Sequence, residues 1–221
     1  MATLNLGILG GFSGTVGTVV GSTNKKGDDI IRARSKKRRS ANTEGQVSQQ
    51  TKFGATTGFM QPLNALLNAL LKTGLKQKAS AENMSAYNYA CRHALKNAVV
   101  GTDAQPELDY SKVIISDGNL SRISGATAIK EGDNIKFSWS DSVESAVGKA
   151  TDKVNLLVYN VTNGEISYSM GEVLRSAKTA NLPIPYSETG DQLLFYLFFQ
   201  SASDPTLVST SQYLGTVTVT E

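Results

Sequence analysis

The chain has 221 residues, of which 40% are hydrophobic and 19% charged, with a formal net charge of +3. Its single cysteine and single histidine exclude an internal disulfide framework and a zinc or iron–sulfur site within one chain, because such sites need several ligands. No stretch approaches the ~18 apolar residues of a membrane-spanning helix, and the N-terminus lacks the pattern of a secretory signal. We therefore expect a protein of the cytoplasm or of a virion.

The charge is divided unevenly along the chain. Residues 1–100 carry 14 Lys/Arg against 4 Asp/Glu, a balance of +10, and residues 101–221 carry 8 against 15, a balance of −7. Such asymmetry indicates a part that faces a polyanion, or an arm that docks on an acidic neighbour.

Residues 1–41 are predicted to form a glycine-rich β-hairpin with a basic arm. Glycines and β-branched residues alternate over 7–21, the turn residues of 24–27 follow, and 28–34 is predicted to be the return strand. A lone hairpin is marginally stable in water, so we expect contacts elsewhere to fix its conformation. The predicted assembly contacts are Gly11, Gly14, Gly17, Val19 and Val20.

The basic arm has the highest density of positive charge in the sequence, with six cations within eight residues. They are Arg32, Arg34, Lys36, Lys37, Arg38 and Arg39. Such a run can neutralise several phosphates of a nucleic acid without reading its sequence. It can equally bind an acidic protein surface, or remain solvated charge, and the sequence leaves these three interpretations open.

Residues 42–101 are predicted to be helical. Thr43 and Gln46 have the spacing of a capping box ahead of a helix over 44–60. Pro62 then precedes a stripe of leucines at helical spacing, formed by Leu63, Leu66, Leu67, Leu70, Leu71 and Leu75. A third helix is predicted over 80–99, with Met84, Tyr87, Cys91, Leu95 and Val99 on one face.

Residues 108–221 are predicted to form an immunoglobulin-like antiparallel β-sandwich, so that the whole chain is of the α+β class. Apolar residues alternate with polar ones, and turn dipeptides separate the runs. Trp139 is expected in the core. The predicted strands are 111–116, 119–123, 134–140, 153–160, 165–169, 179–184, 192–200 and 211–219.

The residues that carry enzymatic chemistry are scarce. Cys91 and His93 are two positions apart and would point in different directions from a helix, so we expect Cys91 in the core and His93 as an ordinary helix residue. The glycines at 11, 14 and 17 do not match a phosphate-binding loop. We therefore predict a protein that is not an enzyme, with no catalytic residues, metal, cofactor or small-molecule substrate.

The opening LNLGILGGFSGTVGTVVGS, followed by a charged turn and IIRARS, resembles the signature of a Bacteroidota family of about this length. YSKVIISDGNL, FSWSD and DKVNLLVYN resemble later blocks of the same family. The resemblance implies a two-part organisation, and the family has no assigned activity. Where its members tend to place a proline after the strand, this chain has Ser35 and four cations.

The leading hypothesis is a structural or assembly protein, encoded by a phage or mobile element, that forms homo-oligomers through its N-terminal part. The alternative is sequence-nonspecific binding of nucleic acid by the basic arm, and both functions coexist in proteins that package a genome. An adhesive or carbohydrate-binding sandwich is a third interpretation, with Tyr159, Tyr168, Tyr186 and Tyr196 as available aromatic residues.

Overall fold

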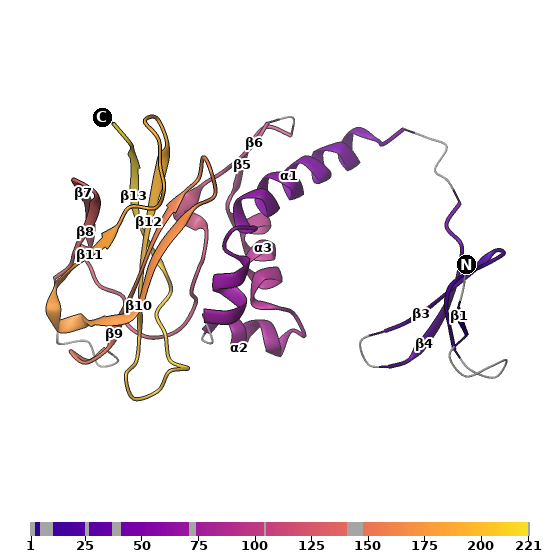
Figure 1. Ribbon diagram of the computed structural model, residues 1–221, viewed down its shortest axis with the longest axis horizontal. Coiled ribbons are helices and arrows are strands. Elements are labelled where there is room, and N and C mark those ends of the chain that lie inside the picture. The colour runs from indigo at the N-terminus through magenta and orange to yellow at the C-terminus, as the bar shows by residue number, and fades with distance from the viewer. Residues whose placement is uncertain are drawn as a thin grey trace. The chain divides into compact units, whose positions relative to one another are not determined.

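The computed structural model describes residues 3–4, 11–24, 27–36, 41–70, 74–103, 105–140 and 148–220. These residues belong to two compact units, Met1–Thr43 and Glu44–Glu221, and each unit is described by itself. The first unit consists of strands, whereas the second combines helices with antiparallel sheets (Figure 1). The mixed α+β class predicted from the sequence is thus confirmed.

The first unit is an antiparallel sheet in the order β1 (Thr3–Leu4), β2 (Phe12–Val16), β3 (Val19–Thr23) and β4 (Asp29–Ala33). The predicted hairpin corresponds to β3 and β4, joined by a turn in which the Asn24 side chain accepts a hydrogen bond from the Asp28 amide. The glycine-rich segment 7–21, expected as the first part of that hairpin, contains two strands within its described part, because the chain reverses at Gly17 and Thr18. Gly17 has a φ of +57° there, which is costly for other residues.

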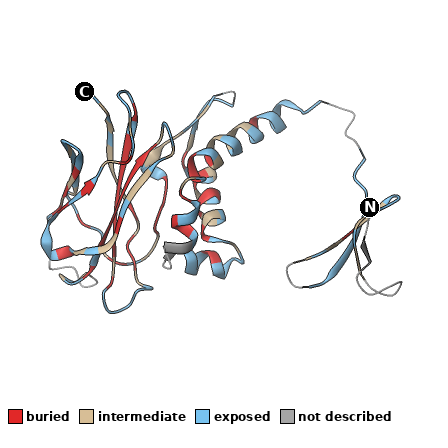
Figure 2. Cartoon of the chain, in the orientation of Figure 1, coloured by how far each residue is buried: buried red, intermediate tan, exposed pale blue. Residues whose placement is uncertain are grey.

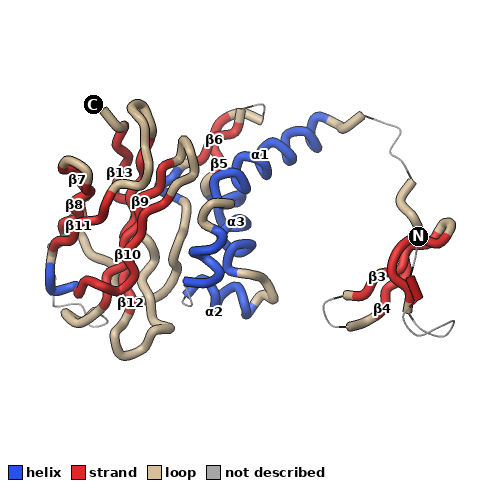
Figure 3. Tube along the Cα trace, in the orientation of Figure 1, coloured by secondary structure: helices blue, strands red, loops and turns tan. Residues whose placement is uncertain are grey.

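The second unit begins with a helical layer (Figure 3). Its described elements are α1 (Glu44–Met60), the π-helical turn η1 (Leu66–Leu70), α2 (Gly74–Ala81) and α3 (Ala86–Asn97). The predicted helix over 44–60 has the bounds of α1, and Thr43 precedes its first residue. Leu63, Leu66 and Leu67 are buried, as their spacing indicates, while Leu71 and the side chain of Leu70 lie outside the described residues.

The predicted third helix starts later and ends earlier than 80–99. Asn83 adopts a left-handed conformation with a φ of +55°, and the Ser85 hydroxyl accepts a hydrogen bond from the Asn88 amide at 3.1 Å, which starts α3. Val99 already belongs to β5 (Val99–Gly101), which pairs with β6 (Pro106–Leu108). The face that α3 buries is rich in alanine rather than in large side chains: Ala86, Ala90, Cys91 and Ala94. Small residues allow close packing of a helix on its neighbours.

The rest of the second unit forms two antiparallel sheets. One has the order β10 (Ile166–Leu174), β9 (Lys153–Asn160), β12 (Gln192–Gln200) and β13 (Gln212–Thr218). The other has the order β11 (Thr179–Pro183), β8 (Asn134–Ser138) and β7 (Thr127–Glu131). The 3-10 turns η2 (Tyr110–Lys112) and η3 (Arg175–Ala177) lie outside the sheets.

The strand predictions were right for β9 and β12, whose bounds are those expected, and nearly right for β8, β11 and β13. The predicted strand 165–169 is the first part of β10, which continues past a bulge to Leu174. Strands over 111–116 and 119–123 are wrong: the first begins with η2, and the second makes only isolated bridges to Ser209. Strand β7 was not predicted.

The sheet that contains β9 and β12 is buried on both of its faces. Leu157, Tyr159 and Tyr196 point into a core shared with the helices. The alternate residues, such as Val158, Phe195 and Leu197, point into a core shared with the three-stranded sheet. Figure 2 shows the burial concentrated on these two strands and on the helix faces turned toward them. Within the second unit, the helices and the two sheets therefore share cores and form three layers, so the predicted segments 42–101 and 108–221 are not separate domains from residue 44 onward.

A buried arginine closes one end of the core between the two sheets. Arg175 is 1% exposed, its Nη1 lies 3.7 Å from the carboxylate of Asp152, and its guanidinium lies 4.7 Å from the ring centre of Phe199. The indole Nε1 of Trp139 donates a hydrogen bond to the Arg175 carbonyl oxygen at 2.7 Å. Trp139 is thus a core residue, as predicted.

Candidate functional site

The described part of the basic arm lies along an edge strand. Arg32 belongs to β4, and the amide of Arg34 donates a hydrogen bond to the Thr18 carbonyl oxygen, which continues the pairing beyond the strand. Arg32, Arg34 and Lys36 are all exposed. Because side chains alternate along a strand, Arg32 and Arg34 share a face of the sheet. Lys37, Arg38 and Arg39 lie outside the described residues.

The opposite face of this sheet carries several apolar side chains, with Thr23 and Asp29 at one end. The pairing register places Val16 opposite Val19, and Val19 opposite Ala33, so that these side chains share a face with Ile31. Val16 is 57% exposed and Ile31 is 66% exposed. An apolar face of this kind favours association with another surface, because burial of each such side chain contributes roughly 1.5–3 kcal/mol.

The predicted assembly residues have different places in the sheet. Val19 lies on the apolar face, whereas Val20 pairs with Arg32 and shares its face. Gly17 forms a turn in open space. Gly14 lies within β2, and a side chain at Gly11 would collide with the Asp29 carboxylate. The sequence did not identify Gly21 as a site of close contact, although a Cβ there would collide with the backbone and ring of Phe12. The spacing of the glycines does not indicate which of them lies against another strand.

Cys91 and His93 lie in settings that do not activate them. Cys91 is buried, and burial raises the pKa of its thiol, which keeps it protonated. Burial also lowers the pKa of His93, an effect that the nearby Asp117 carboxylate partly opposes. Among the described residues, no group of three or more His, Cys, Asp or Glu side chains is placed to hold a metal ion.

The tyrosines considered for a carbohydrate-binding face are dispersed. Tyr159 and Tyr196 are buried, whereas Tyr168 and Tyr186 are exposed on β10 and on the loop before β12. The Tyr159 hydroxyl donates to the Phe59 carbonyl oxygen at 3.0 Å, and the Tyr196 hydroxyl donates to the Tyr110 carbonyl oxygen at 2.9 Å. Tyr159 thus joins the sheet to α1, and Tyr196 joins it to the turn η2. Burial raises the pKa of Tyr159 to about 12.

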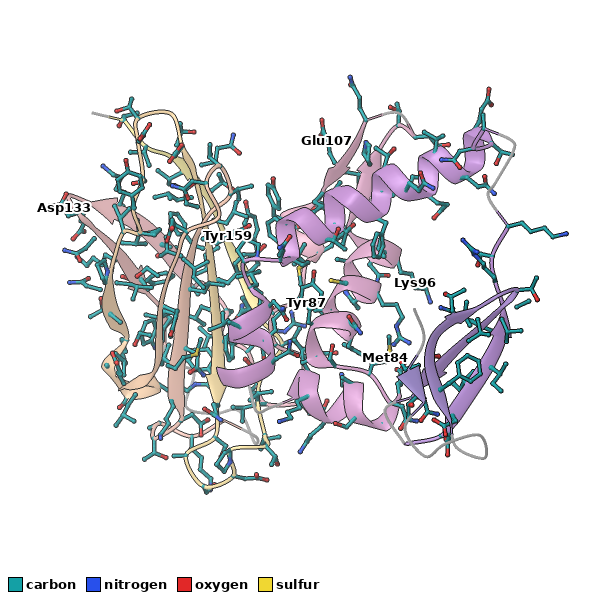
Figure 4. The ribbon with its side chains drawn as sticks, turned by 45° about the vertical axis from the view of Figure 1, so that its right-hand side comes forward. Met84, Tyr87, Lys96, Glu107, Asp133 and Tyr159 are labelled. Atoms are coloured by element: carbon teal, nitrogen blue, oxygen red, sulfur yellow. The ribbon has the colours of Figure 1, made fainter. Side chains whose placement is uncertain are left out.

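A groove of about 680 Å³ opens beside these tyrosines, between α1, β6 and the ends of β9 and β12. The Phe59 ring stacks on Tyr110 with ring centres 5.3 Å apart, and meets the Tyr159 ring edge-on at 5.0 Å. Glu107 lines the groove from β6. Figure 4 shows Glu107 on β6 beside α1, and Tyr159 on the side of the sheet that faces the helices. Burial, and then the charges of Tyr213 and Glu107, raise the pKa of Tyr110.

The sequence did not predict this groove, since its walls come from four separate segments of the chain. The sequence does show the components: glycines within α1, and a Pro-Glu-Leu-Asp-Tyr run over 106–110. Only the packing of α1 on the sheet brings Phe59, Tyr110 and Tyr159 together.

The family model of DUF6266, a family of unknown function, matches residues 11–215. The chain therefore belongs to this family, which agrees with the expected uncharacterised family of about this length. No curated protein and no solved structure matches the chain. Within the described part of the chain, none of the helices combines the length and the apolar character needed to cross a membrane.

Proposed function

We propose that this protein is a non-enzymatic structural protein, encoded by a phage or mobile element of Bacteroidota, that self-associates through its N-terminal sheet. The observation that carries the proposal is the exposed apolar face of that sheet, with Val16 57% and Ile31 66% exposed. The free energy that this apolar face can contribute by burial is gained only when another surface covers it. A second copy of the chain provides the cover in this proposal.

The charges of the two units favour contact between copies. Residues 1–43 carry 8 Lys/Arg against 2 Asp/Glu, and residues 44–221 carry 14 against 17. The first unit of one copy therefore attracts the second unit of another. Such a head-to-tail contact repeats from copy to copy and produces rings or filaments.

We also propose an immunoglobulin-like sandwich as the displayed module. If the seven strands are lettered in chain order, β7, β8 and β11 take the places of strands A, B and E. Strands β9, β10, β12 and β13 then take those of C, C′, F and G, with C′ added to the sheet of C, F and G as in variable-type domains.

Sedimentation of the purified full chain at several concentrations tests the self-association. We expect oligomers whose size grows with concentration, and a shift toward monomer for Val16→Ser combined with Ile31→Ser. The control is Ile129→Ser, which changes an exposed isoleucine on β7 of the sandwich. A wild-type chain that stays monomeric at low and high salt overturns the proposal.

The second candidate function is sequence-nonspecific binding of nucleic acid. It is favoured by the exposed Arg32, Arg34 and Lys36, which the sequence continues with three further cations. Binding of this kind weakens steeply with salt. Replacement of Lys36, Lys37, Arg38 and Arg39 by alanine should remove most of the affinity for a labelled duplex, and unchanged binding would exclude the arm.

A further inference from the structure

Strand β4 forms an edge of the N-terminal sheet and, among the described residues, pairs with β3 on one side only. The Arg34 amide donates a hydrogen bond to the Thr18 carbonyl oxygen at 2.7 Å, so the even-numbered residues of this segment direct their backbone groups toward β3. Backbone groups alternate in direction along an antiparallel strand. Those of the odd-numbered residues of β4 therefore point outward, and these residues are Asp29, Ile31 and Ala33. An edge of this kind is a template for pairing with another strand.

The charges along this edge are complementary to those of an antiparallel copy. Asp28 immediately precedes β4, and Arg34 immediately follows it. When two antiparallel copies of the strand are centred on Ile31, Asp28 of each copy lies opposite Arg34 of the other. All five residues of β4 then pair, and the outward backbone groups of the two strands meet at every second residue.

The side chains of β4 suit this pairing on both faces of the sheet. Ile30 and Ile31 point to opposite faces, and they are 44% and 66% exposed. On one face Ile31 meets the Ile31 of the second copy, which joins the apolar faces of the two sheets into one surface. On the other face Ile30 lies opposite Arg32, whose methylene stem can pack on it while the guanidinium stays in water.

We infer that β4 of one copy pairs antiparallel with β4 of a second copy, in the register centred on Ile31. The inference rests on the proposed self-association and adds the strand edge to the apolar face as a contact. The charge pattern selects a second copy as the partner, because an antiparallel copy presents a basic residue opposite each acidic one. This contact is a closed two-fold dimer, and assembly beyond the dimer uses the apolar face or the attraction between the two units.

Cross-linking of single cysteines tests the register. Ile31→Cys should form a disulfide between two copies under mild oxidation, because Cα atoms of a hydrogen-bonded pair lie about 5.5 Å apart, within the reach of a disulfide. Ala33→Cys is the matched control: each Ala33 lies opposite Asp29 of the other copy, about 13 Å along the strand from the second Ala33. The native Cys91 is buried, so the wild type should stay reduced. Equal cross-linking at both positions, or none at position 31, would contradict the register.

Two charge variants of the full chain test the pairing of Asp28 with Arg34. Arg34→Asp and Asp28→Arg each place like charges opposite one another at both ends of the symmetric contact. Each variant alone should self-associate at least about tenfold more weakly than the wild type in sedimentation experiments. Arg122→Asp carries the same charge change as Arg34→Asp on an exposed loop residue of the second unit, and it should associate like the wild type.

The decisive result is the behaviour of a 1:1 mixture of Arg34→Asp and Asp28→Arg. In a mixed pair, each acidic end lies opposite a basic end, so the mixture should regain the association that each variant alone has lost. A mixture that associates no better than the separate variants overturns the inference.

Ala33→Pro separates the edge from the apolar face. The amide of Ala33 points outward, so proline keeps the hydrogen bonds between β4 and β3 but removes one from the outer pairing at each end, and association should weaken. If the wild type assembles and Ala33→Pro assembles equally well, the edge is not the contact, although self-association stands. If the wild type is monomeric, the proposed function fails as well. Amide exchange in β2 and β3 checks that the sheet of each variant is folded.

Discussion

The contact between the helical layer and the sheet can be tested by removing one oxygen atom. Tyr196 is fully buried on β12, and its hydroxyl donates to the Tyr110 carbonyl oxygen at 2.9 Å. Tyr196→Phe keeps the ring and its packing, so it creates no large cavity. It removes the hydrogen bond that joins the sheet to the segment leading from the helices.

The expected loss in the free energy of unfolding depends on the hydrogen bonds that the Tyr110 carbonyl oxygen keeps in the variant. A buried acceptor that loses its only partner costs about 1–3 kcal/mol. The Tyr110 carbonyl keeps a second, longer hydrogen bond from the Val113 amide at 3.3 Å, so we expect a loss of about 1–2 kcal/mol in the free energy of unfolding. For a domain of this size that loss lowers the melting temperature by about 2–8 °C.

Urea unfolding followed by two probes measures the effect. Far-ultraviolet circular dichroism reports on the helices, and the fluorescence of Trp139, the single tryptophan, reports on the core between the sheets. Because the helices share a core with β9 and β12, both probes should give one midpoint in the wild type and one lower midpoint in Tyr196→Phe.

The control is Tyr186→Phe, whose hydroxyl bonds to Glu188 on the surface and whose residue is 71% exposed. It should change stability by less than about 0.5 kcal/mol. The reasoning is refuted if Tyr196→Phe is as stable as this control. Separate midpoints for the two probes in the wild type would contradict the shared core.

Three further predictions concern other parts of the chain. Arg175→Met leaves the Asp152 carboxylate buried without its cation, so it should destabilise the second unit by about 3–5 kcal/mol in the same urea titration. Gly17→Ala forces a left-handed turn on a residue with a side chain and should cost about 1–2 kcal/mol, seen as faster amide exchange in β2 and β3 with no change in the second unit. Burial raises the pKa of Tyr159 from 10.0 to about 12. The folded chain therefore keeps this proton where the unfolded chain loses it, and stability should fall as the pH rises from 10 to 12. Tyrosinate absorbance at fixed urea measures that loss, and Tyr159→Phe should reduce it.

The local sequence was sufficient to predict an element where capping or turn residues mark its ends. The capping pair Thr43 and Gln46 locates the start of α1, which begins at Glu44. Turn residues flank β9 and β12, so their bounds followed from the sequence. The charge division and the scarcity of reactive side chains are likewise properties of composition alone.

Tertiary structure decided which apolar runs pair and which surfaces meet. Residues 113–115 are apolar and buried, but they pack against the helices as irregular chain and do not form a strand, because pairing depends on a partner that the local sequence does not specify. The run over 192–200 lacks alternation because helices cover one face of its sheet and strands cover the other. The groove of Phe59, Glu107 and Tyr159 likewise exists only after α1 packs on the sheet. The spacing of apolar residues in the sequence indicates which residues are buried. The element that covers them is determined by contacts between residues far apart in the chain.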